Sequence, residues 1–516
     1  MHWIIAPVLL PALLAPMIGF VMRHDIVLAR AASFAGTACL VGISAYLLSM
    51  TLGGETFVYR LGDWQPPFGI VLVLDRLSAL MVLLTSVLAL IVLWHAAATG
   101  WDSRGRHFHA LFQFQLMGVA GAFLTGDVFN LFVFFEVLLI ASYGLMIHGG
   151  GQQRLGAGLQ YIVINLAGST LFLFALGVLY ATTGTLNLAD LTLRMQEIAV
   201  EDAALVRVAA MLLMIVFAVK AALFPVQFWL PGTYANAPAP VAALFAIMTK
   251  VGAYAIIRVH GSAFGPGIEA TDGQSAAWLF PAAIVTIAIG AVGVLGAKRL
   301  LPLISFSVVG SMGTLLVAVA AFTPEATTAG LYYLLHSTFA AAALFLLADL
   351  VLARRGSEAL SLLPATVQNG LFAALFFAAA IGMAGMPPLS GFLGKLFVLD
   401  TLRDPGTIVW AWSSVLIGSL LTIVGFARAG SILFWKSTAP EAGAPPAVQE
   451  PEGRAEPEAP ARAGVAQLVP TFATLAILAS LAVFAGPVVD FLEATSLQLY
   501  DRSSYIEAVL GQSGGN

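Results

Sequence analysis

The stretch MLLMIVFAVKAALFPVQFWLP, residues 211–231, decides the fold class. It is apolar and long enough to cross a bilayer core, which takes about 20 residues in a helix. Lys220 lies midway along it, too deep to reach either interface easily. A charge at the bilayer centre costs about 2.5–3.5 kcal/mol, so Lys220 is a functional candidate. Pro225 interrupts the helix and frees a carbonyl, and a charged residue beside a broken helix is typical of an intramembrane ion site.

The whole chain has the same apolar character. Of its 516 residues, 60% are hydrophobic and 10% are charged, whereas soluble proteins carry about 25% charged residues. The net charge of −4 predicts no nucleic-acid partner. The single cysteine, Cys39, excludes a disulfide framework and a cysteine-based metal site. Residues 1–20 lack a basic segment and a cleavage site, so we expect a first helix there and not a signal peptide.

We therefore expect an all-α membrane protein with about 14 transmembrane helices. A Gly126-Asp127 turn separates the fourth predicted span from the fifth. The predicted limits are 3–21, 28–50, 70–96, 110–126, 128–148, 159–182, 204–224, 238–260, 277–296, 302–322, 327–352, 368–399, 408–434 and 467–489.

The basic residues of the loops predict the orientation. Of the 23 Lys and Arg residues, 12 lie in loops on the side of the first loop, here named side A, and 6 on the opposite side, side B. Basic loops favour the cytoplasm, so we expect side A to be cytoplasmic and both termini to lie outside. Residues 437–466 are rich in Pro, Ala and Glu, which predicts a disordered cytoplasmic linker. The polar tail after Asp490 is expected to form a short surface helix.

Further ionisable residues lie inside predicted spans. Glu136 has no local polar partner, so it either pairs with a residue of another helix or stays protonated. Lys250 is near the middle of its span, with Thr249 before it and Tyr254 one turn later. Like Lys220, these residues are candidates for handling charge inside the membrane.

The second half of the chain carries a similar set. Lys395 follows a helix break at Pro387 and Pro388, although its place near a helix end leaves a structural role open. His336 suits a proton relay, with a satisfied core histidine as the alternative. Arg428 is either a possible relay end or an interfacial anchor.

Other polar residues favour structural roles. Asp75 is expected to pair with Arg76, and Asp349 to cap its helix or pair with Arg354 and Arg355. Four histidines are expected at the cytoplasmic surface, namely His95, His107, His109 and His148.

Spans four to eight and nine to thirteen form two units of five. An odd number of helices inverts the topology of a tandem repeat, so we expect inverted repeats, each with a broken fourth helix that carries a lysine. The predicted divisions are 1–97 (spans one to three), 108–260 (first unit), 277–436 (second unit), 437–466 (linker) and 467–516 (last span and tail).

Several segments carry a resemblance to a known family. They are YRLGDWQPPFGIVLVLDRLSALMVLLT (59–85), DVFNLFVFFEVLLIASYGLMIHG (127–149), KAALFPVQFWLPGTYANAPAPVAALFAIMTKVG (220–252), KRLLPLISFSVVGSMG (298–313), AGMPPLSGFLGK (384–395) and FARAGSILFW (426–435). The chain resembles the antiporter-like subunits of Mrp-type cation/proton antiporters, respiratory complex I and membrane-bound hydrogenases. Among these it is most similar to the D subunit of the Mrp type.

The resemblance implies roles for individual residues. Glu136 and Lys220 match a glutamate and a lysine that pair, Lys250 matches a central relay lysine, and Lys395 a terminal one. His336 matches a relay histidine, although alanines stand where some relatives have a further lysine. Such subunits work with other membrane subunits in a hetero-oligomer.

These observations predict a proton-translocating subunit of a multisubunit sodium/proton antiporter in a prokaryotic cell membrane, a secondary transporter and not an enzyme. No cofactor is expected, because ligands for one are absent. One alternative is a proton-pumping subunit of a complex I-like or hydrogenase complex, which would differ in its partners. Another is a stand-alone substrate transporter, which would be active when expressed alone.

Overall fold

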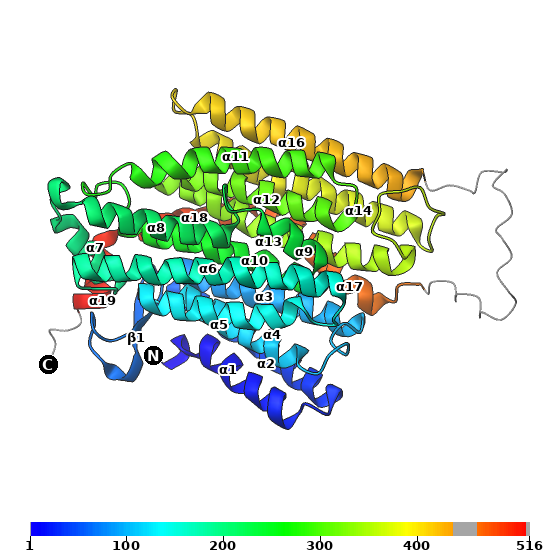
Figure 1. The fold of residues 1–516 in the computed structure, drawn as a ribbon, viewed down its shortest axis with the longest axis horizontal. Helices are drawn as coiled ribbons and strands as arrows, with labels where there is room; N and C mark the ends of the chain where they lie inside the picture. The colour runs from blue at the N-terminus through cyan, green and yellow to red at the C-terminus, as the bar shows by residue number, and fades with distance from the viewer. Residues whose placement is uncertain (1, 437–461, 512–516) are drawn as a thin grey trace, which may run out of the picture.

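The computed structural model describes residues 2–436 and 462–511 and is almost entirely helical. Its long helices run along the long axis of the molecule, while β1, α7 and α19 gather at one end (Figure 1). The helices are α1 (Ala6–Pro16), α2 (Ile26–Thr51), α3 (Arg76–Ala98), α4 (Phe108–Leu124), α5 (Val128–Met146), α6 (Gln152–Thr183), α7 (Leu188–Glu197), α8 (Ala204–Ala221), α9 (Trp229–Asn236), α10 (Ala239–Ala255), α11 (Gln274–Gly296), α12 (Leu300–Val319), α13 (Pro324–Arg355), α14 (Asn369–Ala384), α15 (Ser390–Thr401), α16 (Ile408–Gly430), α17 (Val465–Val483), α18 (Ala485–Tyr500) and α19 (Arg502–Leu510). The strands are β1 (Phe57–Arg60) and β2 (Val71–Leu74).

The helices match the predicted membrane spans. Within the described ranges, eleven helices are long and apolar enough to cross a membrane. Three shorter apolar helices, at Ala6–Val21, Phe108–Leu124 and Asn369–Ala384, join them. Each of these helices overlaps one predicted span. The all-α membrane fold is thus confirmed, and the number of fourteen crossings stays a prediction.

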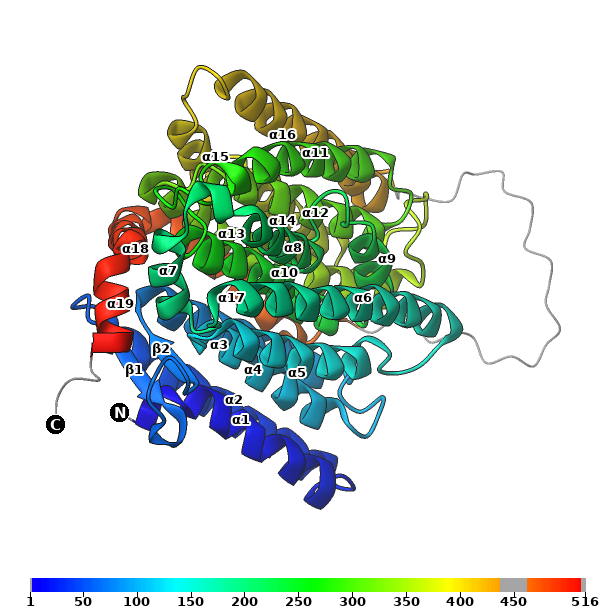
Figure 2. The same cartoon turned by 60° about the vertical axis from the view of Figure 1, so that its left-hand side comes forward.

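The predicted start of the third span is wrong. Residues 71–74 form β2, which pairs antiparallel with β1, and α3 begins only at Arg76. A short apolar run such as VLVL fits a buried strand as well as a helix, so its sequence does not separate the two. The strands pack through Val58, Val71 and Val73 against Val509 of α19, which lies beside them in Figure 2.

Both predicted helix breaks are present. α8 ends at Ala221, Ala222 adopts a left-handed conformation (φ 53°), and Pro225 lies in the seven residues before α9. α14 ends at Ala384, Gly385 is left-handed (φ 79°), and Pro387 and Pro388 precede α15. The pairing of the two five-helix units as inverted repeats stays a prediction.

Two helices occupy the centre of the bundle. Every residue of α10 is buried, and so is nearly all of the membrane-spanning part of α13. They pack against each other, and other helices surround them in both views (Figures 1 and 2). Lys250 lies on α10 and His336 on α13, so the fold places both candidates deep inside the protein.

The C-terminal segment is helical to Leu510. Most of the predicted linker, residues 437–461, lies outside the described residues, and α17 begins at Val465. The tail beyond Asp490 belongs to α18 and α19. α18 packs against α13, where Thr328 donates a hydrogen bond to Ser496 at 3.0 Å.

Candidate functional site

Lys220 lies at the end of α8, one residue before the helix breaks. Its Nζ atom donates a hydrogen bond to Asn165 Oδ1 of α6 at 3.0 Å and lies 5.7 Å from the ring centre of Phe135. At the break, the Val219 carbonyl accepts hydrogen bonds from the Ala222 backbone N–H at 3.3 Å and from the Trp229 indole at 2.9 Å. Non-helical backbone is tolerated at membrane depth only when such groups are satisfied, and the Trp229 contact meets this need at the break beside Lys220.

Glu136 is partly buried on α5, and Ser169 of α6 donates a hydrogen bond to its carboxylate. The described residues contain no ion pair between Glu136 and Lys220. Each contacts a polar side chain of α6 instead, and the two side chains, Asn165 and Ser169, are four residues apart. Positions i and i+4 are neighbours on one helix face. α6 therefore contacts both the glutamate and the lysine that the resemblance pairs directly.

Lys250 is completely enclosed (0% exposed), and its Nζ atom has no hydrogen-bond partner among the described residues. Thr249 and Tyr254 bond to backbone carbonyls and not to the lysine. α10 approaches α8 closely at Gly252, where an added Cβ would lie 2.5 Å from the Ala221 nitrogen. This glycine brings the helix of Lys250 against the helix end that carries Lys220.

His336 connects α13 to the second broken helix. Its Nδ1 atom lies 2.9 Å from Ser390 Oγ, the first residue of α15. An added Cβ at Gly391 would lie 2.8 Å from His336 Nε2 and 2.1 Å from the Gly382 carbonyl oxygen. The His336 side chain therefore contacts the break between α14 and α15 directly, and only glycine fits at position 391.

Lys395 of α15 turns back toward the same break. Its Nζ atom donates to the Ala384 carbonyl at 2.7 Å and to Ser419 Oγ of α16 at 2.8 Å. A carbonyl freed by the end of α14 therefore accepts from the lysine. The lysine also lines a polar cavity of about 20 Å³ with Ser311 of α12, enough space for a single water molecule.

Arg428 does not contact the row formed by Glu136, Lys220, Lys250, His336 and Lys395. It is exposed at the end of α16 and donates to the Ala297 carbonyl at 2.6 Å. This position suits an interfacial anchor.

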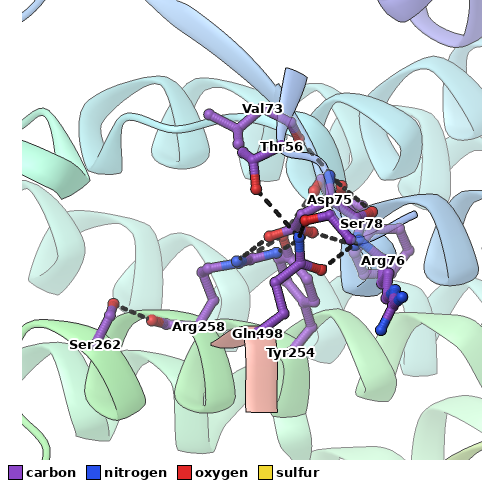
Figure 3. Close-up of polar contacts among 11 residues, drawn as sticks. Thr56, Val73, Asp75, Arg76, Ser78, Tyr254, Arg258, Ser262 and Gln498 are labelled. Atoms are coloured by element: carbon purple, nitrogen blue, oxygen red, sulfur yellow. Dashed lines mark hydrogen bonds and ion pairs between the residues drawn. The ribbon is translucent and has the colours of Figure 1, made fainter. Parts of the chain in front are cut away.

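Three structural expectations are wrong. Asp75 does not pair with Arg76 but with Arg258, at 2.5 and 2.7 Å, as Figure 3 shows. Arg258 is buried at the end of the α10 span, in a π-helical turn (Ile256–His260), so one of the six basic residues counted in the side-B loops lies in a helix. The Asp349 carboxylate bonds to His95 and Trp101, while the nearby arginines bond elsewhere. The four histidines expected at the surface are the third case. Only His107 is exposed, and the other three are buried.

Sequence reasoning missed the partners of the row. They are small polar residues or glycines on neighbouring helices, namely Asn165, Ser169, Gly252, Ser390, Gly391 and Ser419. Asn165 and Ser169 carried a usable signal, because two polar residues four positions apart in an apolar span mark one polar face.

The fold is that of a multi-pass membrane protein in which lysines lie beside two broken helices. The chain belongs to the family described as NADH:quinone oxidoreductase/Mrp antiporter, TM, whose model matches residues 125–422. It is 38% identical to the D subunit of a probable K(+)/H(+) antiporter of Rhizobium meliloti (strain 1021), over 99% of this chain and 97% of the relative. It is 37% identical to the D subunit of the Na(+)/H(+) antiporter of Bacillus subtilis (strain 168), over 84% and 87%.

A solved structure has the same fold. A chain of the Mrp complex from Dietzia sp. DQ12-45-1b is 30% identical, with a TM-score of 0.87 over 99% of this chain and all of that one. The predicted family membership is therefore confirmed.

Proposed function

We propose that this chain is the D-type subunit of a multisubunit monovalent cation/proton antiporter and that it moves protons along the row Glu136, Lys220, Lys250, His336 and Lys395. One observation carries the proposal. Lys250 is a fully enclosed lysine with no hydrogen-bond partner among the described residues, between two lysines that lie at helix breaks. An unpaired buried ammonium is costly, so such a residue favours reversible protonation over a fixed charge.

The proposed mechanism uses repulsion between like charges in neighbouring members of the row. A proton on one lysine disfavours a proton on its neighbour, because like charges repel strongly where water is scarce. At Lys220, a shift of the side chain from Asn165 toward Glu136 would stabilise the charged form, and the return would favour release. Protons would thus move stepwise, each lysine changing the affinity of the next.

The remaining parts of the proposal concern the partner subunits, the orientation in the membrane and the exchanged cation. The chain works with other membrane subunits in a prokaryotic inner membrane, with side A toward the cytoplasm and both termini outside. The exchanged cation is sodium or potassium, since the names of the two relatives differ on this point. A proton-pumping subunit of an oxidoreductase complex is the second candidate, because the family description also names one. Purification of the complex and identification of its subunits separates the two.

The test uses the complete complex in everted vesicles from a host that lacks its own antiporters. Lys220→Ala should lower cation-driven proton movement by about 100-fold or more, as expected for loss of a proton-transfer group. Lys298→Ala, at an exposed lysine, should leave it unchanged. Full exchange by an assembled Lys220→Ala complex would overturn the proposal, and running the assay with Na⁺ or K⁺ alone identifies the cation.

A further inference from the structure

A large cavity opens at the side-A end of the bundle. Its volume is about 610 Å³, and it lies among the start of α6, the connection from α9 to α10, and the end of α13. Polar residues of these elements and of the adjoining loops line it, including Arg104, Gln152, Arg154, Asn236, Asp349 and Glu358. The cavity is therefore suited to hold water next to the buried part of the protein.

Asp349 connects this cavity to the interior. Its Oδ2 atom lies 2.9 Å from His95 Nε2 of α3, and its Oδ1 atom accepts from the Trp101 indole at 2.9 Å. The Asp349 side chain is 14% exposed, whereas that of His95 is 0% exposed. α3 packs against α10, the helix of Lys250, and Asp349 shares α13 with His336. In this pair, Asp349 faces the cavity and His95 lies in the protein interior.

The basic groups around the pair keep their charge. Arg104 stacks over the Trp101 ring at 3.7 Å, and Arg154 donates to the carbonyls of His148, Gly150 and Asn236. Arg354, the next arginine along α13, donates to the Leu350 carbonyl and to Gln467 of α17. Arginine does not deprotonate in proteins, so these groups cannot exchange protons.

The other titratable groups near the cavity have hydrogen-bond or ion-pair partners of their own. Glu358 pairs with Arg299. Burial alone would raise the pKa of Asp102, but hydrogen bonds from His109 and Arg30 outweigh burial and lower it. Burial lowers the pKa of His148, which bonds to the Trp101 carbonyl. In the described part of the chain around this cavity, Asp349 and His95 are the titratable pair that reaches both the cavity and the interior.

We propose that the Asp349–His95 pair is the site where the chain exchanges protons with water on side A. A hydronium ion in the cavity gives its proton to the pair, which becomes a carboxylate beside an imidazolium, and a water molecule leaves. Passing that proton inward restores the neutral imidazole. His336 is 13 residues away on α13, about 20 Å along the helix, so the transfer needs water molecules over the remaining distance. This inference rests on the proposed function of the row.

The test uses the complete complex in everted and in right-side-out vesicles, with the pH of each face varied separately. Asp349→Asn removes the charge that favours the imidazolium and should lower the pH midpoint for exchange on the side-A face by about 1 unit. His95→Gln should slow exchange about tenfold or more by removing the acceptor. The midpoint on the side-B face should not change in either variant.

Two controls separate this role from a structural one. Asp349→Glu keeps a carboxylate and should restore the midpoint, and Glu358→Gln removes a carboxylate from the same cavity and should have no effect. Exchange is normalised to the amount of assembled complex. Unchanged side-A midpoints and rates, or losses that only follow the loss of assembled complex, would overturn the inference. A dead Lys220→Ala complex would at the same time show that the proposed function stands.

Discussion

Asn165 and Ser169 lie one turn apart on α6, and each contacts one member of an oppositely charged pair: Asn165 accepts from Lys220 at 3.0 Å, and Ser169 donates to Glu136. The polar face of α6 therefore gives each of the two residues a hydrogen-bond partner. A small movement of α6 or α8 would change which partner the lysine has. This geometry makes α6 part of the proposed proton path, although α6 carries no residue of the row.

The first prediction concerns Asn165. A hydrogen bond to a charged group contributes about 1.5–3 kcal/mol, so Asn165→Leu should slow exchange about tenfold or more. Asn165→Asp should also slow it, because a fixed carboxylate holds the lysine in its charged form. Exchange in vesicles measures both. Thr170→Val is the matched control, because Thr170 of the same helix bonds only to the Leu166 carbonyl. Wild-type rates in both Asn165 variants would contradict a role for α6.

The second prediction concerns Gly391. Gly391→Ala places a methyl group 2.1 Å from the Gly382 oxygen and 2.8 Å from His336 Nε2, so the histidine or the break must move. Overpacking of this kind costs about 1–3 kcal/mol, and we expect both a lower melting temperature and slower exchange. Gly370→Ala is the control, since its added Cβ meets no atom within 4 Å. An equally stable and active Gly391→Ala complex would show that the contact is not tight.

The third prediction concerns the second break. Lys395→Met removes the donor to the Ala384 carbonyl and should abolish exchange, while Ser419→Ala removes one of two partners and should slow it about tenfold, as expected for a hydrogen bond to a charged group. Ser414→Ala on the same helix is the control, because Ser414 bonds only to the Ala411 carbonyl. If Ser419→Ala and Ser414→Ala slow exchange equally, the hydrogen bond between Lys395 and Ser419 does not contribute to exchange.

The fourth prediction concerns stability at side B. Arg258 and Asp75 form a buried ion pair between α10 and the start of α3 (Figure 3). Arg258→Met leaves an unpaired buried carboxylate and should destabilise the complex by about 3–5 kcal/mol. The double variant Asp75→Asn/Arg258→Met should cost less than Arg258→Met alone, because no buried charge is left unpaired. Thermal unfolding of the purified complex compares them, and additive losses would contradict the pairing.

The sequence predicted the helices and placed the charged residues of the row within them, because apolar length and charge position are local properties; the roles of these residues stay a prediction. Pro225, Pro387 and Pro388 also marked both breaks. Apart from the polar face marked by Asn165 and Ser169, the sequence could not predict which partner each residue contacts, since this depends on how helices rotate against each other. Asp75 pairs with Arg258, which is 183 residues away in the sequence. Lys220 donates its hydrogen bond to Asn165 and not to Glu136. The strand β2 was missed because VLVL has no helical or strand period of its own.

Lys250→Met is the most direct test of the central claim, that the buried row carries protons. Methionine is close in shape and removes a buried charge with no partner among the described residues, so stability should stay the same or rise. Exchange should fall to background if the lysine carries protons. We therefore predict an assembled complex that melts at or above the wild-type temperature and moves no protons against the cation. A Lys250→Met complex that exchanges at the wild-type rate would contradict the account.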